Sequence, residues 1–400
     1  MHAVVIGSGP AGWIAGGACV AEGWSATIVS PEFGAFAPTY CAWLDDLPQD
    51  WRSEVACTWS EVDVYSERGQ HTLSRPYVWI DGKAVRARLE REASGVRLHQ
   101  AKVSSLEAVD GAVQVVTEDG VLAADLVIDC AGRVGGFAQV EAHRSPAALQ
   151  TAYGEFLHAP HARLERPVLM DFRGMDGPHR HPPTFGYVLP LPNRTVLVEE
   201  TVLAARPAVP VEELRGLQLR RKEAYGLSDC EVKEVERVRI AMGGPRAGLR
   251  GFASAFGAAG GMVHPATGYL FATLLRVRPR LRLGLRRALR ASKVERRVEG
   301  MGRALWPGTA GLTRGLQVAG LELVLRMDQA RVAGFFDAFF RSPERSWSAY
   351  MRGDPSLFGV LRSMASTFGR LPAKERTWVG AGFLRRPQAL DEPAPGEQIL

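Results

Sequence analysis

A glycine pattern at the start of the chain constrains the fold most strongly. Residues 3–6 form an apolar run, and Gly7, Gly9 and Gly12 follow it with the spacing Gly-x-Gly-x-x-Gly. This combination predicts a buried strand that turns tightly into a helix beginning at about Pro10. The unpaired N–H groups at the start of such a helix bind phosphate. We therefore predict that this turn holds the pyrophosphate of a dinucleotide, through Gly7, Ser8, Gly9, Pro10, Ala11 and Gly12.

The segments after the glycine pattern fit a βαβ unit. The sequence predicts a helix over residues 11–22, closed by Gly23, and a second strand over residues 25–29. An acidic residue that binds the ribose usually ends this strand, but Ser30 occupies the position. The nearest carboxylate is that of Glu32. The sequence leaves open which of these residues contacts the ribose.

Length and composition indicate a globular protein with more than one domain. The chain has 400 residues, of which 46% are hydrophobic and 23% are charged, so two domains with a sizeable core are expected. The five cysteines are odd in number and lack a Cys-x-x-Cys pair, which argues against a disulfide scaffold and a metal site. We therefore expect a cytoplasmic protein without a metal.

The chain is expected to be soluble or to lie on a surface. Its first predicted strand begins at residue 3, so no signal peptide is expected, and no apolar stretch is long enough for an ordinary membrane span. The net charge is +6, and many arginines fall in residues 276–297. This segment fits a solvated helix face, a contact with anionic lipid or a nucleic-acid patch. No nucleic-acid recognition motif accompanies it, so we expect no nucleic-acid partner.

The middle of the chain alternates between two kinds of segment. Residues 36–48 are rich in turn formers and predict an exposed loop, whereas residues 83–93 predict a helix capped by Asp81. Later strands are expected over the following ranges: 96–100, 102–108, 112–117 and 124–132. The turn at residues 118–120 predicts a hairpin. The last strand ends at Gly132, a further candidate cofactor-binding residue, as in a strand that returns to the first sheet.

The second half predicts another sheet and then helices. Residues 184–190 and 195–201 predict antiparallel neighbours, followed by a helix over residues 210–225. A glycine-rich loop at residues 256–269 runs into a long helix and is expected to supply more backbone donors to a ligand. Its candidate cofactor-binding residues are Gly260, Gly261, Met262 and Pro265. Residues 302–371 predict helices, and the proline-containing residues 373–400 predict an extended or disordered tail.

Six segments together resemble the flavin-dependent lycopene cyclases, a branch of the FAD-binding fold shared with aromatic hydroxylases and geranylgeranyl reductases. They are residues 5–12, 40–46, 75–77, 150–154, 197–201 and 260–269, in the order of that family. Two departures are Ser30, where the family usually has an acid, and Cys41, where it usually has glycine. The resemblance covers most of the chain, to about residue 370.

The resemblance implies an α/β fold in which a Rossmann-type FAD-binding domain of the aromatic hydroxylase and geranylgeranyl reductase class is interleaved with an antiparallel-sheet substrate domain. The FAD-binding domain is expected over residues 1–75, 95–147 and 240–300. The substrate domain is expected over residues 76–94 and 148–239, before a helical region at residues 301–372 and the tail.

The implied reaction closes a ring on the end group of a linear carotenoid such as lycopene. A proton adds to one alkene, a second alkene attacks the cation, and a proton then leaves, so there is no net redox change. The protein must supply an acid, groups that stabilise the cation and a dry cavity. Glu199 and Glu200 are neighbours on a predicted strand and so point to opposite faces. The resemblance favours Glu199, kept protonated by burial; the alternative is an exposed strand with two solvated acids.

The resemblance implies further site residues, each with a structural alternative. Asp45 and Asp46 could shape the cavity or its mouth, or belong to an ordinary loop. His264 belongs to the loop beside the flavin, by packing or by catalysis. The aromatic residues that could line a polyene tunnel, or simply form core, are Tyr40, Trp43, Tyr187 and Tyr269.

The implied cofactors are FAD, active in its reduced form, and NAD(P)H as its reductant. The enzyme class is an intramolecular lyase or isomerase. A carotenoid substrate lies in a bilayer, so we expect a cytoplasmic, peripherally membrane-associated protein, with other carotenoid enzymes as a further class of partner. Residues 276–297 and Phe335, Phe336, Phe339 and Phe340 could form the membrane contact, or the phenylalanines could be core.

Two other functions fit the same sequence. One is a net-redox flavoprotein, either a monooxygenase or a prenyl-chain reductase, which would consume NAD(P)H with each product. The other is a carotenoid- or lipid-binding protein without catalysis. Retention of Glu199 and of all three turn glycines argues against the second.

Overall fold

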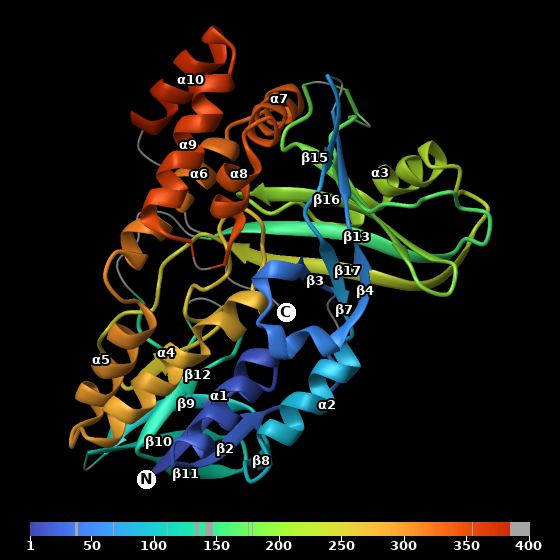
Figure 1. Ribbon diagram of the computed structural model, residues 1–400. Coiled ribbons are helices and arrows are strands. Elements are labelled where there is room, and N and C mark those ends of the chain that lie inside the picture. The colour runs from blue at the N-terminus through green and yellow to red at the C-terminus, as the bar shows by residue number, and fades with distance from the viewer. Residues whose placement is uncertain are drawn as a thin grey trace.

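A parallel sheet, a large antiparallel sheet and a set of C-terminal helices make up the protein. Figure 1 shows the parallel-sheet unit at the bottom, the large sheet at the upper right, and the C-terminal helices in orange and red at the upper left. The computed structural model describes residues 1–36, 39–66, 68–109, 111–132, 136–140, 147–174, 176–177, 179–353 and 355–384.

The first unit contains a five-stranded sheet in which all strand pairs are parallel, with the order β18-β12-β1-β2-β8. Its strands are β1 (His2–Ile6), β2 (Ser25–Ser30), β8 (Arg97–Gln100), β12 (Leu126–Asp129) and β18 (Ala253–Ala255). The central strands are apolar runs because both faces are covered. The predicted βαβ unit and the returning strand are confirmed.

Two layers cover the faces of this sheet. Side chains of β1 alternate, so Val5 packs among helices α1 (Pro10–Ala21), α2 (Gly82–Glu92) and α4 (Phe271–Leu289). Val4 packs toward a three-stranded sheet, together with part of α5 (Val294–Leu305). That sheet consists of β9 (Val103–Val109), β10 (Ala112–Thr117) and β11 (Gly120–Ala124), and the predicted hairpin joins β10 to β11.

The large sheet has seven strands in the order β17-β13-β16-β15-β14-β5-β6. They are β5 (Val62–Ser66), β6 (Gly69–Leu73), β13 (Ala148–His158), β14 (Val168–Asp171), β15 (Thr184–Leu191), β16 (Thr195–Ala205) and β17 (Glu231–Met242). All neighbours are antiparallel except β14 and β5. The predicted antiparallel pairing of β15 with β16 is confirmed, and Asn193 and Arg194 in the turn between them have positive φ. Helix α3 (Val211–Ala224) covers one face, where it packs on β13 and β16.

A small sheet and the C-terminal helices enclose the opposite face of the large sheet. The small sheet has the order β3-β7-β4 and consists of β3 (Tyr40–Trp43), β4 (Val55–Trp59) and β7 (Tyr77–Ile80), with the short helices η1 (Leu44–Asp46) and η2 (Gln49–Glu54). The helices are α6 (Ala310–Val324), α7 (Gln329–Phe340), α8 (Glu344–Met351), α9 (Leu357–Arg370) and α10 (Ala373–Leu384). No helix among the described residues is both long and apolar enough to cross a membrane.

Four local predictions from the sequence are wrong. Residues 40–43 form β3, not an exposed loop, because Trp43 is fully buried. Strands β5 and β6 belong to the large sheet and not to the unit with the parallel sheet, where the FAD-binding domain was expected. Helix α2 packs on α1 in that unit and not with the expected substrate domain. Residues 373–384 form α10 because Val379 packs in the core. The rest of the predicted tail, residues 385–400, lies outside the described residues.

Candidate active site

The turn between β1 and α1 has the geometry of a phosphate cradle. Gly7 has φ +105°, and a Cβ there would lie 2.5 Å from the carbonyl oxygen of Cys130. A Cβ at Gly12 would lie 1.8 Å from the carbonyl oxygen of Gly7, so strand and helix approach closely. A Cβ at Gly9 would meet nothing within 4 Å, which leaves its backbone open to a ligand. Helix α1 begins at Pro10, so its N-terminal N–H groups lie at this open side.

Ser8 and Ser30 join the cradle to the end of β2. The Ser30 hydroxyl donates to the Ser8 hydroxyl at 3.0 Å, and Ser8 donates to the backbone oxygen of Glu32 at 2.7 Å. Glu32 is exposed. Ser30 therefore stands at the position that carries an acid in other dinucleotide folds, and its hydroxyl is hydrogen-bonded to that of Ser8.

The second glycine-rich loop approaches the cradle, but the N–H groups of its candidate residues Gly260, Gly261 and Met262 form hydrogen bonds within the loop. The N–H groups of Gly260 and Met262 donate to Gly257, and that of Gly261 donates to Ala258, because the loop turns tightly upon itself. Met262 and Pro265 are buried. The loop instead comes close to the start of α1, since a Cβ at Gly257 would lie 2.6 Å from that of Ala11.

A cavity of about 1020 Å³ lies between the large sheet, β3, β7 and helices α6, α7 and α9. Gly132, just after the returning strand β12, also lines it, so the cavity reaches the unit that contains the parallel sheet. Most of its lining is apolar. Representative lining residues are Tyr40, Leu197, Leu203, Phe185, Phe335, Phe336, Phe339 and Met364.

Glu199 is the candidate acid in this cavity. Its side chain belongs to β16, is almost fully buried and accepts a hydrogen bond from the Thr201 hydroxyl at 2.6 Å. Burial, followed by the nearby Glu236, raises the pKa of Glu199 to about 8. The carboxyl therefore holds its proton at neutral pH, which is the form that can donate it.

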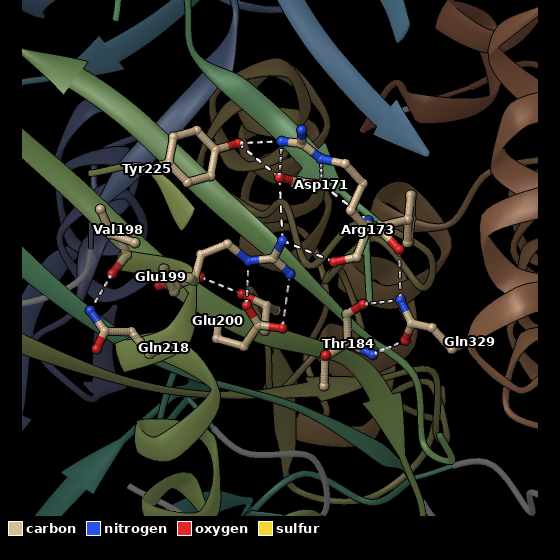
Figure 2. Close-up of polar contacts among 12 residues, drawn as sticks. Asp171, Arg173, Thr184, Val198, Glu199, Glu200, Gln218, Tyr225 and Gln329 are labelled. Carbon is tan, nitrogen blue, oxygen red and sulfur yellow. Dashed lines mark hydrogen bonds and ion pairs between the residues drawn. The ribbon is translucent and has the colours of Figure 1, made fainter. Parts of the chain in front are cut away.

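Glu200 points to the opposite face, as strand alternation predicts, and so does not enter the cavity. Its oxygens accept from Arg221 of α3 at 2.8 and 3.2 Å, and Arg221 also lies 3.2 Å from Asp171. Figure 2 shows Glu200 and Asp171 in this cluster with Arg173 and Tyr225. A carboxylate paired in this way cannot serve as an acid for a cavity substrate, so Glu200 is removed from the candidates.

Three tyrosine hydroxyls meet at the cavity wall. The Tyr77 hydroxyl lies 3.0 Å from that of Tyr187 and 2.9 Å from that of Tyr269. Burial raises the pKa of all three, so they remain neutral. Tyr187, Tyr269 and Tyr40 line the cavity. Tyr77, which lies within the segment 75–77 of the resemblance, was missed as a site residue.

Trp43, Asp45 and Asp46 lie behind the cavity wall and do not line it. Trp43 packs with its ring centre 5.0 Å from that of Tyr77. Arg75 lies over Trp43 and is held by both acids, at 2.8 Å from Asp45 and 3.3 Å from Asp46. The two acids therefore anchor a cation beneath the tyrosine cluster, and the ordinary structural alternative is the better account of all three residues.

His264 is a packing residue. Its Nδ1 accepts from the N–H of Ala266 at 3.2 Å, and its Nε2 lies 2.8 Å from the carbonyl oxygen of Tyr350 and 2.7 Å from Nε2 of Gln317. Burial lowers the pKa of His264 to about 4, and the ring is therefore neutral. It ties the glycine-rich loop to α8 and does not line the cavity.

The phenylalanines of α7 and the arginines of α4 do not form one surface. Phe339 and Phe340 are buried, and Phe335 and Phe336 line the cavity. The phenylalanines therefore belong to the interior of the protein and not to a membrane contact. Helix α4 packs on α1 and α5, where Arg278, Arg282 and Arg286 pair with Glu92 and Glu22. Exposed apolar side chains lie on α9 instead: Phe358, Leu361 and Phe368 are 71%, 47% and 41% exposed.

Several solved structures share this architecture. A geranylgeranyl bacteriochlorophyll reductase-like protein from Thermoplasma acidophilum superposes with a TM-score of 0.68 over 94% of this chain and 98% of its own, at 12% identity. The halogenase PltM in complex with phloroglucinol and FAD superposes with a TM-score of 0.60 over 96% and 94% of the two chains, at 14% identity. These similarities confirm the predicted fold class.

Sequence relatives identify the family. Chloroplastic lycopene beta cyclase of Arabidopsis thaliana is 29% identical over 397 residues, which cover 92% of this chain and 78% of the relative. An uncharacterized carotenoid cyclase of Deinococcus radiodurans is 30% identical over 401 residues, covering 96% and 94%. The sequence model of the lycopene cyclase protein family matches residues 3–376. The chain therefore belongs to the lycopene cyclase family.

Proposed function

We propose that this protein closes an ionone-type ring on the linear end group of lycopene or a related carotenoid, with Glu199 as the acid. The observation that carries this proposal is the protonated Glu199 carboxyl in a large apolar cavity that also reaches the FAD-binding unit. Family membership supports the same class of substrate. The enzyme would be an intramolecular lyase or isomerase without net redox change.

Glu199 starts the reaction by donating its proton to the terminal alkene. The resulting cation is attacked by the second alkene, and loss of a ring proton restores neutrality, so atoms and electrons balance. Thr201 orients the Glu199 carboxyl through its 2.6 Å hydrogen bond. Because the lining is mostly apolar, water is excluded from the cation, which would otherwise be captured as an alcohol.

Aromatic side chains support the cation without adding charge. Tyr40, Tyr187 and Tyr269 line the cavity, and their rings can present negative π faces to a positive carbon. The hydroxyl contacts to Tyr77 fix the orientation of Tyr187 and Tyr269. The rings therefore keep their position while the polyene folds onto itself.

The cradle fits the pyrophosphate of FAD. Gly9 leaves an open approach to the start of α1, and Gly7 and Gly12 permit the tight turn. Ser8 and Ser30 would replace the usual acid near the ribose. Reduced FAD, with NAD(P)H as its reductant, would supply an electron-rich ring that stabilises positive charge.

The exposed apolar face of α9 is the proposed contact with the membrane that holds the substrate. Phe368 is both exposed and part of the cavity lining, so this face lies beside a route into the cavity. Phe358 and Leu361 extend the same apolar surface. This placement fits a cytoplasmic, peripherally membrane-associated enzyme.

Pigment analysis in cells that accumulate lycopene tests the proposed reaction. Expression of the protein should yield a cyclic carotenoid with the same mass as lycopene, and Glu199→Gln should not. In purified form, one reduction of the flavin should support many turnovers. A product of altered mass, or use of about one NAD(P)H per product, would instead indicate a net-redox enzyme.

Vesicle flotation tests the membrane contact. The double change Phe358→Ser and Leu361→Ser should reduce flotation with anionic lipid vesicles, because it removes exposed apolar area from α9. Leu219→Ser is the matched control, since Leu219 is 49% exposed on α3. Equal flotation of both variants would contradict the assignment.

A further inference from the structure

A second carboxyl, that of Glu236, lies in the same row of the sheet as Glu199. Gly154 of β13 is paired with Glu199 of β16 on one side and with Glu236 of β17 on the other. On its far side, Glu199 is paired with Tyr187 of β15. Paired residues of neighbouring strands present their side chains to the same face. The row Glu236, Gly154, Glu199 and Tyr187 therefore faces the cavity, and Glu236 is part of the lining.

The glycine between the two acids leaves their side chains room. A Cβ at Gly154 would lie 3.3 Å from Cβ and 3.4 Å from Cγ of Glu199. Those distances are at or below ordinary contact, so a larger residue would push the Glu199 side chain away. Without a side chain between them, the two carboxyls act on each other across a single strand.

Burial raises the pKa of Glu236, and two hydrogen bonds from Thr39 act against that shift. Its Oε1 accepts from the N–H of Thr39 at 2.8 Å, and its Oε2 accepts from the Thr39 hydroxyl at 2.8 Å. Two donors on the two oxygens favour the ionised form, whereas Glu199 has a hydrogen bond from one hydroxyl and is more deeply buried. Of the two acids, Glu236 therefore loses its proton first.

We propose that Glu236 is a positioning residue of this site, whose fixed negative charge keeps the proton on Glu199 until an alkene is presented to it. This inference rests on the proposed function of Glu199 as the acid. The charge acts by electrostatic repulsion: with Glu236 ionised, a second carboxylate at Glu199 would place two like charges in one apolar cavity. A proton returned from the ring carbon is then recaptured by Glu199 for the next turnover.

The other titratable groups near the pair are neutral, carry the same sign as a carboxylate, or are the arginines Arg237 and Arg239. Burial of the tyrosines keeps Tyr40 and Tyr187 uncharged. Glu234 lies at the exposed end of β17, and Glu200 is paired with Arg221 on the other face. The remaining groups are Cys41 on β3, whose thiol burial keeps neutral, and Arg237 and Arg239, which occupy the alternate positions of β17. Arg237 pairs with Glu212 on the α3 side.

Infrared titration of the Glu199 carboxyl tests the proposal without substrate. The carbonyl band of the protonated acid is assigned by its loss in Glu199→Gln and then followed against pH in the full-length protein. Glu236→Gln should lower the apparent pKa of Glu199 by about one unit or more, a tenfold loss of proton affinity. Glu236→Asp, which retains the charge, should restore most of the shift. Glu234→Gln, the matched control on the same strand, should leave the band within about 0.3 units.

Two further measurements keep the inference separate from the proposed function. Thr39→Val removes one of the two donors to Glu236 and should give a smaller shift in the same direction, even where Glu236→Gln fails to fold. The alkaline limit of cyclisation should move with the infrared titration. An unchanged titration in Glu236→Gln and in Thr39→Val would overturn the inference. A shifted titration in a protein that makes no cyclic product would instead overturn the proposed function alone.

Discussion

The two faces of the large sheet give neighbouring glutamates opposite roles. On the face covered by α3, Glu200 is fully buried and its charge is balanced by Arg221, which also contacts Asp171. On the cavity face, Glu199 is bound by the hydroxyl of Thr201 and surrounded by apolar lining. The same residue type is thus a structural ion on one face and a neutral acid on the other.

The covering element decides this difference. Helix α3 brings Arg221 and Lys222 onto the sheet, where they form ion pairs with Glu200 and Glu155. The cavity face brings hydrocarbon and hydroxyl groups, which favour the neutral form. Chemistry that needs a protonated carboxyl is therefore supported on only one of the two faces.

The first prediction concerns activity, which should depend on the glutamate of the cavity face. Glu199→Gln should lower the rate of cyclisation by about 10²–10⁴-fold, the usual contribution of a general acid, because an amide cannot donate the proton. Its free energy of unfolding should be unchanged or higher at neutral pH. Pigment analysis and chemical denaturation measure the two quantities. A variant that retains more than a tenth of the rate would contradict the assignment of Glu199 as the acid.

The second prediction concerns the stability of the face covered by α3, where Glu200 is paired with Arg221. Arg221→Met should lower the free energy of unfolding by roughly 3–5 kcal/mol, because it leaves Glu200 and Asp171 buried without this cation. The double variant Glu200→Leu and Arg221→Met should recover part of that loss. The rate per folded molecule should remain within about threefold of the parent protein in both variants. Equal stability of Arg221→Met and the parent would show that the cluster contributes little.

Strand alternation explains how much of this contrast could be predicted from sequence. The adjacent positions of Glu199 and Glu200 predicted opposite faces, and the glycine pattern predicted the cradle and its βαβ unit. Which face would receive a cation was not predictable, because Arg221 lies on a separate helix. Glu236 was missed because β17 carries several exposed charges and the partner Thr39 is 197 residues away.

Aromatic and loop residues show the same limit. Tyr77, Tyr187 and Tyr269 meet from three separate segments, so no local pattern marks their hydroxyl contacts. Trp43 is fully buried although its neighbours predict a loop, because tertiary packing against Tyr77 overrides local propensity. The residues that sequence analysis missed are those whose role depends on contacts between distant segments, which the composition of a single segment does not reveal.

The third prediction concerns how the stability contributed by Glu199 depends on pH. The pKa of Glu199 is about 8 in the folded protein and near the ordinary value of 4.5 in the unfolded chain. Between these values the folded protein binds one proton more, so this group's contribution to stability is full below pH 4.5 and is lost as pH rises toward 8.

Comparison with Glu199→Gln isolates that contribution. From about pH 6 to pH 7.5 the parent should lose up to roughly 1.4 kcal/mol per pH unit relative to the variant, measured by denaturant unfolding at each pH. Glu200→Gln, which changes the ion-paired glutamate on the opposite face, is the matched comparison. Parallel pH curves for the parent and Glu199→Gln would contradict the raised pKa of Glu199.

The last prediction concerns the glycine that is paired with each glutamate on a neighbouring strand, where alanine should have only a small effect. Gly186 is paired with Glu200, and a Cβ there would lie 2.5 Å from Nε of Arg221; Gly154 is paired with Glu199, and its nearest contact would be 3.2 Å, to Leu197. Gly186→Ala should therefore cost about 1 kcal/mol of stability through displacement of a pinned guanidinium, at little cost in rate per folded molecule.

Gly154→Ala should show the opposite pattern, with a small loss of stability and a larger loss of rate. The neighbours at this position need to move by only a few tenths of an ångström, so the loss of stability should be smaller than for Gly186→Ala. The Glu199 side chain is one of those neighbours, and a displaced acid donates its proton less well, so the rate should fall severalfold. Denaturation and initial rates of the two alanine variants, measured side by side, check this crossover. If Gly186→Ala were the slower enzyme and Gly154→Ala the less stable protein, the division of the sheet into a structural face and a reactive face would be wrong.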